Sequence, residues 1–177
     1  MRVVAGLCVL GLLGLSGCSS SNSNSSTGPS GNVVHSCGGG NASGSMTATI
    51  SGRSFEATCL VTLTFNGKLF DLGGTDVAQS NPNGFQDVTF VVSATGPGTY
   101  TIDSTTIAQG ASGNNAAYSI AGSQLWVSGA GSGGGGTITF TTLTSSSAAG
   151  TFSINFVAGP GGSGTKTLTN GKFNVTF

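Results

Sequence analysis

Cysteine and histidine are the most reactive side chains in this sequence, and there are few of them. The 177 residues include four cysteines and one histidine. Cys18 stands where an apolar run ending at Leu15 gives way abruptly to serine and asparagine. A cysteine thiolate can form a thioether with a lipid glycerol, which a serine hydroxyl does not do readily. The place of Cys18 therefore indicates lipid attachment.

The residues before Cys18 have the parts of a secretory signal peptide. Arg2 supplies a positive charge, and the apolar run that follows is about 13 residues long, too short to span a bilayer core of roughly 30 Å. The last four residues resemble the lipobox of bacterial lipoproteins, with Leu15 in the apolar position, Ser16 and Gly17 in the small positions, and Cys18 as the lipidated N-terminus. This resemblance implies that segment 1–17 is removed and that Cys18 receives palmitate-type acyl chains. The alternatives are an ordinary secretory signal with an incidental cysteine, or an uncleaved anchor.

The residues after Cys18 bear on which membrane holds the protein. Each buried methylene of an acyl chain contributes about 0.8 kcal/mol, so several chains on one cysteine give a stable anchor. In the lipoproteins that this signal resembles, an aspartate directly after the cysteine favours retention in the inner membrane. Ser19 and Ser20 stand there instead, so the resemblance implies the outer membrane, and its periplasmic and surface faces stay open.

Residues 18–45 are expected to form a lipidated N-terminus and a disordered tether. The segment consists almost entirely of Ser, Asn, Gly and Thr, which cannot bury enough surface to offset the entropy of ordering. A flexible coil of this length has a root-mean-square reach of about 30 Å. His35 and Cys37 lack the second ligand pair that a structural zinc site needs, so His35 is expected to be a solvated linker residue. No metal or other cofactor is predicted.

Cys37 and Cys59 are the thiols that remain beside the lipidated one once the signal peptide is removed. An exported chain meets an oxidising compartment, so a Cys37–Cys59 disulfide is predicted. It would close a loop of about 22 residues and contribute about 3 kcal/mol. Cys59 also shares its alternation with Val61 and Leu63, so a buried reduced thiol is the alternative.

Carboxylates and glycine-rich loops offer little further chemistry. Asp71 and Asp76 flank glycines but supply too few oxygens for calcium, which takes six to eight, so they are interpreted as turn residues. The segment Gly159–Thr167 lacks both the glycine before Lys166 and the following helix that a phosphate-binding loop requires. It is therefore interpreted as a mobile glycine-rich loop.

No catalytic constellation is predicted, so the protein is not expected to be an enzyme. The carboxylates Glu56, Asp87 and Asp103 look like solvated charges at strand edges, and the single histidine lies in the tether. Removing Arg2 with the signal leaves four Lys/Arg against five Asp/Glu, a net charge of −1. Nucleic-acid binding needs a basic stripe, so it is excluded.

Trp126 is the one candidate contact residue for a partner. It is out of phase with Leu125 and Val127, so if those point inward the indole faces solvent, where it could stack on a sugar or contact a protein. The alternative is a ring folded over the edge of the domain.

The elements that must position these residues are strands. From Met46 to Phe177 apolar and polar residues alternate with period two, no helical stripe occurs, and about 130 residues suffice for one core. Asn66-Gly67 and Asn170-Gly171 predict hairpin turns. We expect one all-β domain, residues 46–177, built as an antiparallel β-sandwich of roughly 8–10 strands, with a closed β-barrel as the alternative.

The domain also resembles an uncharacterised domain family of bacterial lipoproteins. The resemblance lies in the following motifs: Met46-x-Ala48-x-Ile50-x-Gly52, Gly98-Thr99-Tyr100, Gly136-Thr137-Ile138-Thr139, Gly150-Thr151-Phe152-Ser153 and Thr169-Asn170-Gly171-x-Phe173-x-Val175. That family has no established activity, so the resemblance implies a fold and a location in the cell envelope.

Three functions remain open at the level of sequence. The first is a non-enzymatic binding or adhesion module that contacts a glycan or another envelope protein. The second is a carrier that holds a small apolar ligand inside a barrel, and the third is an envelope-structural protein. A monomer attached to membrane lipid through acylated Cys18 is expected in each case.

Overall fold

The computed structural model describes residues 35–36, 42–65, 69–77, 84–103, 113–121, 123–129 and 131–177. These residues are all-β, and no helix occurs among them. The strands are β1 (His35–Ser36), β2 (Ser43–Ile50), β3 (Arg53–Glu56), β4 (Cys59–Phe65), β5 (Leu69–Asp76), β6 (Gln86–Ser93), β7 (Gly98–Ile102), β8 (Asn115–Ile120), β9 (Gln124–Gly129), β10 (Gly135–Leu143), β11 (Ser147–Ala158) and β12 (Thr165–Thr176).

The strands follow the alternation in the sequence. In β11 the side chains of Phe152, Ile154 and Phe156 are buried while the intervening Thr, Ser and Asn residues are exposed. The inner residues leave water for the core, and the threonine-rich outer residues suit a pleated surface that faces solvent. Burial of the apolar face of each strand in the core thus fixes which side chains point inward and which point to solvent.

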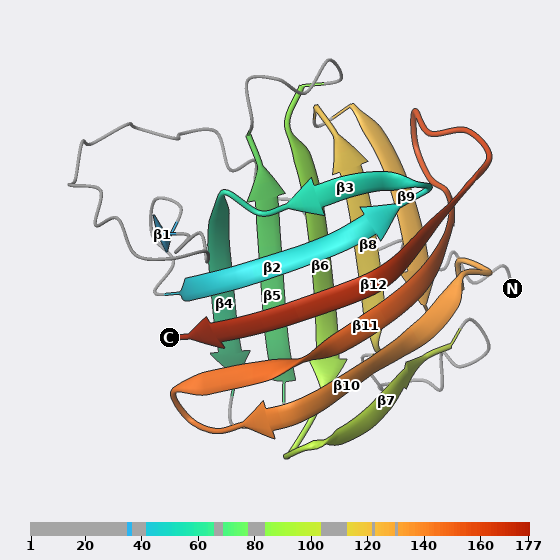
Figure 1. Cartoon of the computed structure of the whole chain (residues 1–177). Coiled ribbons are helices and arrows are strands. Elements are labelled where there is room, and N and C mark those ends of the chain that lie inside the picture. Colours follow the sequence, from blue (N-terminus) through green and yellow to red (C-terminus); the bar gives the residue numbers. More distant parts are fainter. Residues whose placement is uncertain are drawn as a thin grey trace, which may run out of the picture.

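All the strands belong to one sheet that curls over on itself. Its order is β1-β4-β5-β6-β8-β9-β11-β12-β2-β3, with β10 pairing β11 and β7. In Figure 1 the strands β4, β5, β6, β8 and β9 run steeply behind, and β3, β2, β12, β11, β10 and β7 cross in front of them at a large angle. The pairing of Val157 with Val127 joins the two layers at one corner.

This architecture confirms the predicted all-β class and lies between the two predicted forms. Two layers cross as in an orthogonal sandwich, yet the sheet continues through β9 and β11 as in a partly closed barrel. All the strand pairs are antiparallel except β1 with β4, which is parallel. We name the end where β5 stops at Asp76 and β6 begins at Gln86 the upper end, and the opposite end the lower end (Figure 1).

Phenylalanine rings fill the space between the layers. Phe90 lies 5.4 Å from Phe152 and 5.6 Å from Phe173, measured between ring centroids, and Phe140 meets Phe70 edge-on at 5.2 Å. Aromatic rings of this size dominate the energetics of a core. The region between the layers at these rings is therefore packed with side chains.

Three details of the predicted fold are wrong. The described residues contain more strands than the 8–10 expected, because short edge strands such as β1 and β3 carry little hydrophobic signal. Asn170-Gly171 is not a hairpin turn: β12 continues through it, with a register shift against β2 and Asn170 at φ 54°. A bulge needs the same left-handed backbone as the hairpin turn, so the dipeptide does not distinguish them.

The third detail is the tether. Within the segment 18–45 that was expected to be disordered, His35–Ser36 pairs with β4 and residues 43–45 belong to β2. His35 is thus a strand residue opposite Cys59 rather than a free linker residue. Backbone pairing to an existing sheet edge requires no hydrophobic side chain, so the polar composition of this segment did not predict the strand β1.

Candidate functional site

A pocket of about 380 Å³ opens at the lower end of the domain. It is lined by residues from three places in the chain: Leu69 and Phe70 of β5, Ala94 and Thr95 after β6, and Leu143, Thr144 and Ser145 at the turn between β10 and β11. Phe70 and Ala94 are buried and form the base. Among the described residues, the lining is apolar at the base and hydroxyl-bearing at the rim, and these seven residues carry no charged side chain.

Local hydrogen bonds hold the rim of the pocket in place. The Thr144 hydroxyl accepts hydrogen bonds from the amides of Ser146 and Ser147, at 3.2 and 3.0 Å. On the other side, the amide of Thr95 donates to the Tyr100 hydroxyl at 3.3 Å, and that hydroxyl donates to the Gly96 carbonyl at 2.8 Å. These bonds fix the two turns before any ligand arrives, which lowers the entropy cost of binding.

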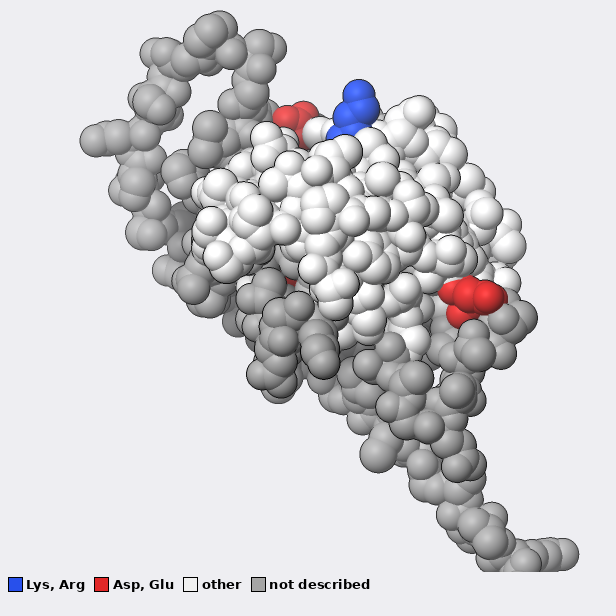
Figure 2. Space-filling view, turned by 90° about the horizontal axis from the view of Figure 1, so that it is seen from below, with Lys and Arg blue, Asp and Glu red and all other residues white. Residues whose placement is uncertain are grey.

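The described part of the surface around the lower end carries little charge. Seen from below, most of the visible described surface is uncharged; one basic group lies near an acidic group at the top of the view, and another acidic group lies at the right (Figure 2). A pocket whose described lining carries no charge supplies no ion-pairing group for an ionic ligand. The arrangement suits a neutral group that has an apolar face and can accept or donate hydrogen bonds at its edge.

Trp126 does not face solvent, so the expectation of an exposed contact residue is wrong. Its side chain is 2% exposed, and the alternation of β9 puts Trp126 and Ser128 inside while Leu125 and Val127 are half-buried. The indole N–H donates to the Ser163 carbonyl at 3.1 Å, and the ring lies 5.5 Å from Tyr118. The larger apolar area of the indole, with its N–H satisfied, decides the phase of the strand.

The glycine-rich segment 159–164 covers Trp126. Gly159 donates to the Leu125 carbonyl at 2.9 Å, and Leu125 donates to the Pro160 carbonyl at 3.1 Å. A Cβ on Gly162 would lie 2.3 Å from the Leu125 carbonyl oxygen and 3.3 Å from the indole. The glycines therefore permit close packing over the indole rather than phosphate binding.

Asp71 and Asp76 do not form a joint calcium site. Both lie in β5 rather than in a turn, and they differ in position by an odd number of residues, so they point to opposite faces of the sheet. Partial burial raises the pKa of Asp71 above its ordinary value of 3.8. Among the residues that the structure describes, no group of three or more His, Cys, Asp or Glu side chains could hold a metal ion.

Asp87 is part of a row of polar side chains rather than a solvated charge. Its carboxylate accepts hydrogen bonds from the hydroxyls of Thr75 at 2.6 Å and Ser119 at 3.1 Å, across three neighbouring strands. Glu56 and Asp103 are exposed. The structure brings neither of these two to the pocket, whose lining contains no carboxylate.

Cys59 is disulfide-bonded. Its predicted partner, Cys37, lies outside the described residues, as does the predicted lipidation motif Leu15, Ser16, Gly17 and Cys18. The strand β1 ends at Ser36, one residue before Cys37, and its residue His35 pairs with Cys59. This pairing brings the chain alongside Cys59 two residues before Cys37.

The upper end gathers polar side chains that sequence reasoning did not single out. Asp76, Gln86 and Tyr118 are buried on the inner face of neighbouring strands, and the Tyr118 hydroxyl donates to Gln86 Oε1 at 2.6 Å. Burial raises the pKa of Tyr118 to about 12, with Arg53 lowering it and Asp76 raising it. Lys166 places its Nζ 4.7 Å from the centre of the Trp126 ring.

Neither the pocket nor this upper-end group had a strong signal in the sequence. The pocket joins residues from β5, from the corner after β6 and from the β10–β11 turn, which only the crossing of the layers brings together. The upper-end residues could have been found as polar residues in inward-facing positions. Gln86, for example, shares its alternation with Val88 and Phe90.

No family model matches the chain, and neither does any curated protein or any solved structure. The described residues include no helix of the length and apolarity that crossing a membrane requires.

Proposed function

We propose that this chain is an exported lipoprotein of the bacterial envelope, held at the outer membrane by acylated Cys18, whose β domain is a non-enzymatic binding module. The observation that carries the binding role is the open pocket at the lower end. Its volume is at the small end of the range for ligand sites, and its base is apolar. The lipid anchor rests on the lipobox-like run from Leu15 to Cys18.

The pocket supports recognition of a neutral group with one apolar face. Its described lining combines buried apolar side chains, Phe70 and Ala94, with three hydroxyl-bearing residues, Thr95, Thr144 and Ser145. Such a group could belong to a glycan or to an uncharged segment of another envelope protein. The buried Trp126 is no longer part of the proposed contact surface.

A carrier of a small apolar ligand is the second candidate, and the apolar base of the pocket favours it. The rings of Phe90, Phe152 and Phe173 pack against one another between the layers, which supports recognition at the surface over enclosure of a ligand there. An envelope-structural role is the third, and it would need no ligand at the pocket.

The pocket is tested with the mature chain 18–177 carrying Cys18→Ser and a neutral fluorescent probe, N-phenyl-1-naphthylamine. We expect saturable binding of one probe per chain. Thr95→Trp places a large ring at the rim and should abolish binding, whereas Thr101→Trp, on the exposed face of β7, should leave it unchanged. Equal binding by the two variants would remove the pocket from the proposal.

The anchor is tested separately by growing cells with a clickable palmitate analogue. The wild-type chain should carry the label and a Cys18→Ser chain should not. A wild-type chain that stays unlabelled contradicts lipidation, whatever the pocket binds.

A further inference from the structure

Two exposed apolar side chains lie side by side at the upper end. Val77 and Phe85 are the large hydrophobic residues that are exposed in the described domain, each 42%. Val77 directly follows Asp76 and Phe85 directly precedes Gln86, and Asp76 and Gln86 are paired across β5 and β6. The two side chains therefore stand next to each other on the same outer face of the sheet.

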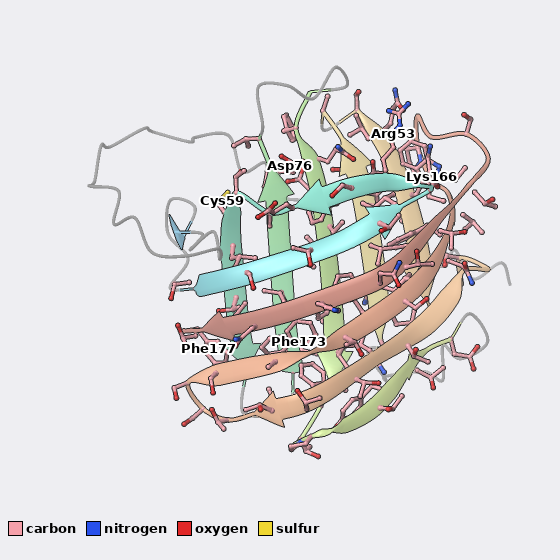
Figure 3. The ribbon with its side chains drawn as sticks, viewed as in Figure 1. Arg53, Cys59, Asp76, Lys166, Phe173 and Phe177 are labelled. Carbon is pink, nitrogen blue, oxygen red and sulfur yellow. The ribbon has the colours of Figure 1, made fainter. Side chains whose placement is uncertain are left out.

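Two cations project from the opposite layer at the same end. Arg53 lies two residues before the buried Phe55 in β3, and Lys166 lies two residues before the buried Leu168 in β12. Because residues two apart in a strand point to the same side, both cations point to the inner face near the start of their strands. Lys166 lies over the Trp126 ring, and the charge of Arg53 reaches Tyr118. Figure 3 shows Arg53, Lys166 and Asp76 toward the upper end, with Phe173 and Phe177 far below.

Neither cation is paired with an acidic side chain among the described residues. The acidic groups on the strands that reach this end are Asp76, which is buried, Asp87, whose oxygens accept hydrogen bonds from two hydroxyls, and Glu56 of β3, which is exposed. Arg53 is exposed and Lys166 is half-buried. Their charges are thus available to an external anionic group, in a mature chain that has four Lys/Arg in all.

Strand β1, which follows the predicted tether in the sequence, is directed away from the upper end. Strand β1 runs parallel to β4 and pairs with its first residues, Cys59 and Leu60, so the N-terminal side of β1 faces upward. The hydroxyl of Thr58, the residue before β4, accepts a hydrogen bond from the amide of Val77 at 3.0 Å. The start of β4 therefore lies beside Val77. Residues 19–34 then separate Cys18 from β1, and they span at most about 60 Å when fully extended.

We propose that the upper end is a membrane-docking surface, with Val77 and Phe85 entering the lipid interface and Arg53 and Lys166 contacting the phosphates of anionic lipids. This docking rests on the proposed lipid anchor, and it adds an orientation for the domain. Apolar and aromatic side chains beside cations are the combination that interfacial binding uses, and each cation near an anionic surface changes affinity about fivefold. The tether keeps the domain close to the membrane and so raises the effective concentration of the docking surface there, which allows weak contacts to hold it.

The test uses the full lipidated protein reconstituted in vesicles, with Phe85→Trp as a reporter and brominated lipids as quenchers. In vesicles that contain phosphatidylglycerol we expect strong quenching, and in pure phosphatidylcholine or 1 M salt we expect it to be largely lost. Ser146→Trp, at the lower end, is the matched control and should stay unquenched. The buried Trp126 gives a constant background in both proteins.

Charge variants separate docking from anchoring. Arg53→Gln and Lys166→Gln should each lower the docked-to-free ratio about fivefold, whereas Lys172→Gln, on the exposed face of β12, should not change it. Near-UV circular dichroism checks that each variant keeps its core. If the protein stays on the vesicles but Phe85→Trp is quenched no more strongly than Ser146→Trp, the docking proposal is overturned and the anchor is not. Protein that washes off the vesicles would overturn the anchor and the docking with it.

Discussion

At the scale of single residues, the structure assigns roles that side-chain type alone does not reveal. Trp126 is large, lone and out of phase with its apolar neighbours, which in sequence is the pattern of an exposed contact residue. Its ring is instead buried against Tyr118 and capped by Ser163. The chemistry of the indole is used for packing and for holding Lys166 in position.

Trp126→Ala should therefore lower stability rather than binding. Removing a buried indole and leaving a cavity costs about 3–5 kcal/mol. Trp126→Phe keeps most of the ring and should cost less. Equilibrium unfolding in guanidinium measures both variants, and a near-zero cost for Trp126→Ala would contradict the buried position.

Tyr118 should make the protein sensitive to alkali. Burial raises the pKa of Tyr118 to about 12, above the ordinary tyrosine value of 10.0. The folded state then holds this proton in a range where the unfolded state has lost it, so stability should fall as the pH rises from about 10 to about 12. Melting temperatures of the wild type and Tyr118→Phe, followed across this range, should show a steeper fall in the wild type. Parallel curves would exclude Tyr118 as the cause.

At the scale of elements, alternation in the sequence predicts most strands but not where they bend. The pattern Phe152, Ile154, Phe156 fixes β11 because a shift of one residue would expose the whole set. Asn170-Gly171 is ambiguous, since positive φ serves both a hairpin turn and a bulge. In this protein β12 pairs with β2 and β11 on both sides of Asn170-Gly171, so the dipeptide forms a bulge within one strand rather than a turn between two.

The bulge in β12 gives a matched pair of substitutions. Asn170 has φ 54°, a conformation that asparagine tolerates and alanine does not. Asn170→Ala should cost about 1 kcal/mol, whereas Asn170→Gly should be nearly neutral. Thermal unfolding of the two variants measures the difference. Equal stabilities would mean that the bulge relaxes when the residue changes.

At the scale of the whole molecule, the fold class was predictable and the sites were not. Strand alternation depends on neighbours along the chain, whereas the pocket and the upper end depend on which strands the curled sheet brings together. Phe70 and Leu143, for example, are far apart in sequence and line one pocket because the layers cross. If the upper end docks on lipid, the pocket at the lower end is presented away from the membrane to the proposed partner.

Reducing the disulfide of Cys59 should weaken this orientation. If Cys59 is bonded to Cys37, reduction releases β1, and the first fixed point of the tether moves to the buried Ala42. The next residue is Ser43, whose hydroxyl lies 2.7 Å from that of Thr176. That position adjoins the turn beside the pocket, since Thr176 pairs with Ser147. The chain between the anchor and the domain also lengthens from residues 19–34 to 19–41, which lowers the effective concentration of the docking surface by about twofold.

Quenching of Phe85→Trp by brominated lipid should therefore fall when a reductant is added to the vesicles. A Cys37→Ser/Cys59→Ser protein should show the same low quenching with and without reductant. A thiol titration of the denatured mature chain supplies the independent check: a Cys37–Cys59 bond predicts that free thiols appear only after reduction. Two free thiols before reduction would exclude the bond, and unchanged quenching after reduction would mean that the domain orients without help from β1.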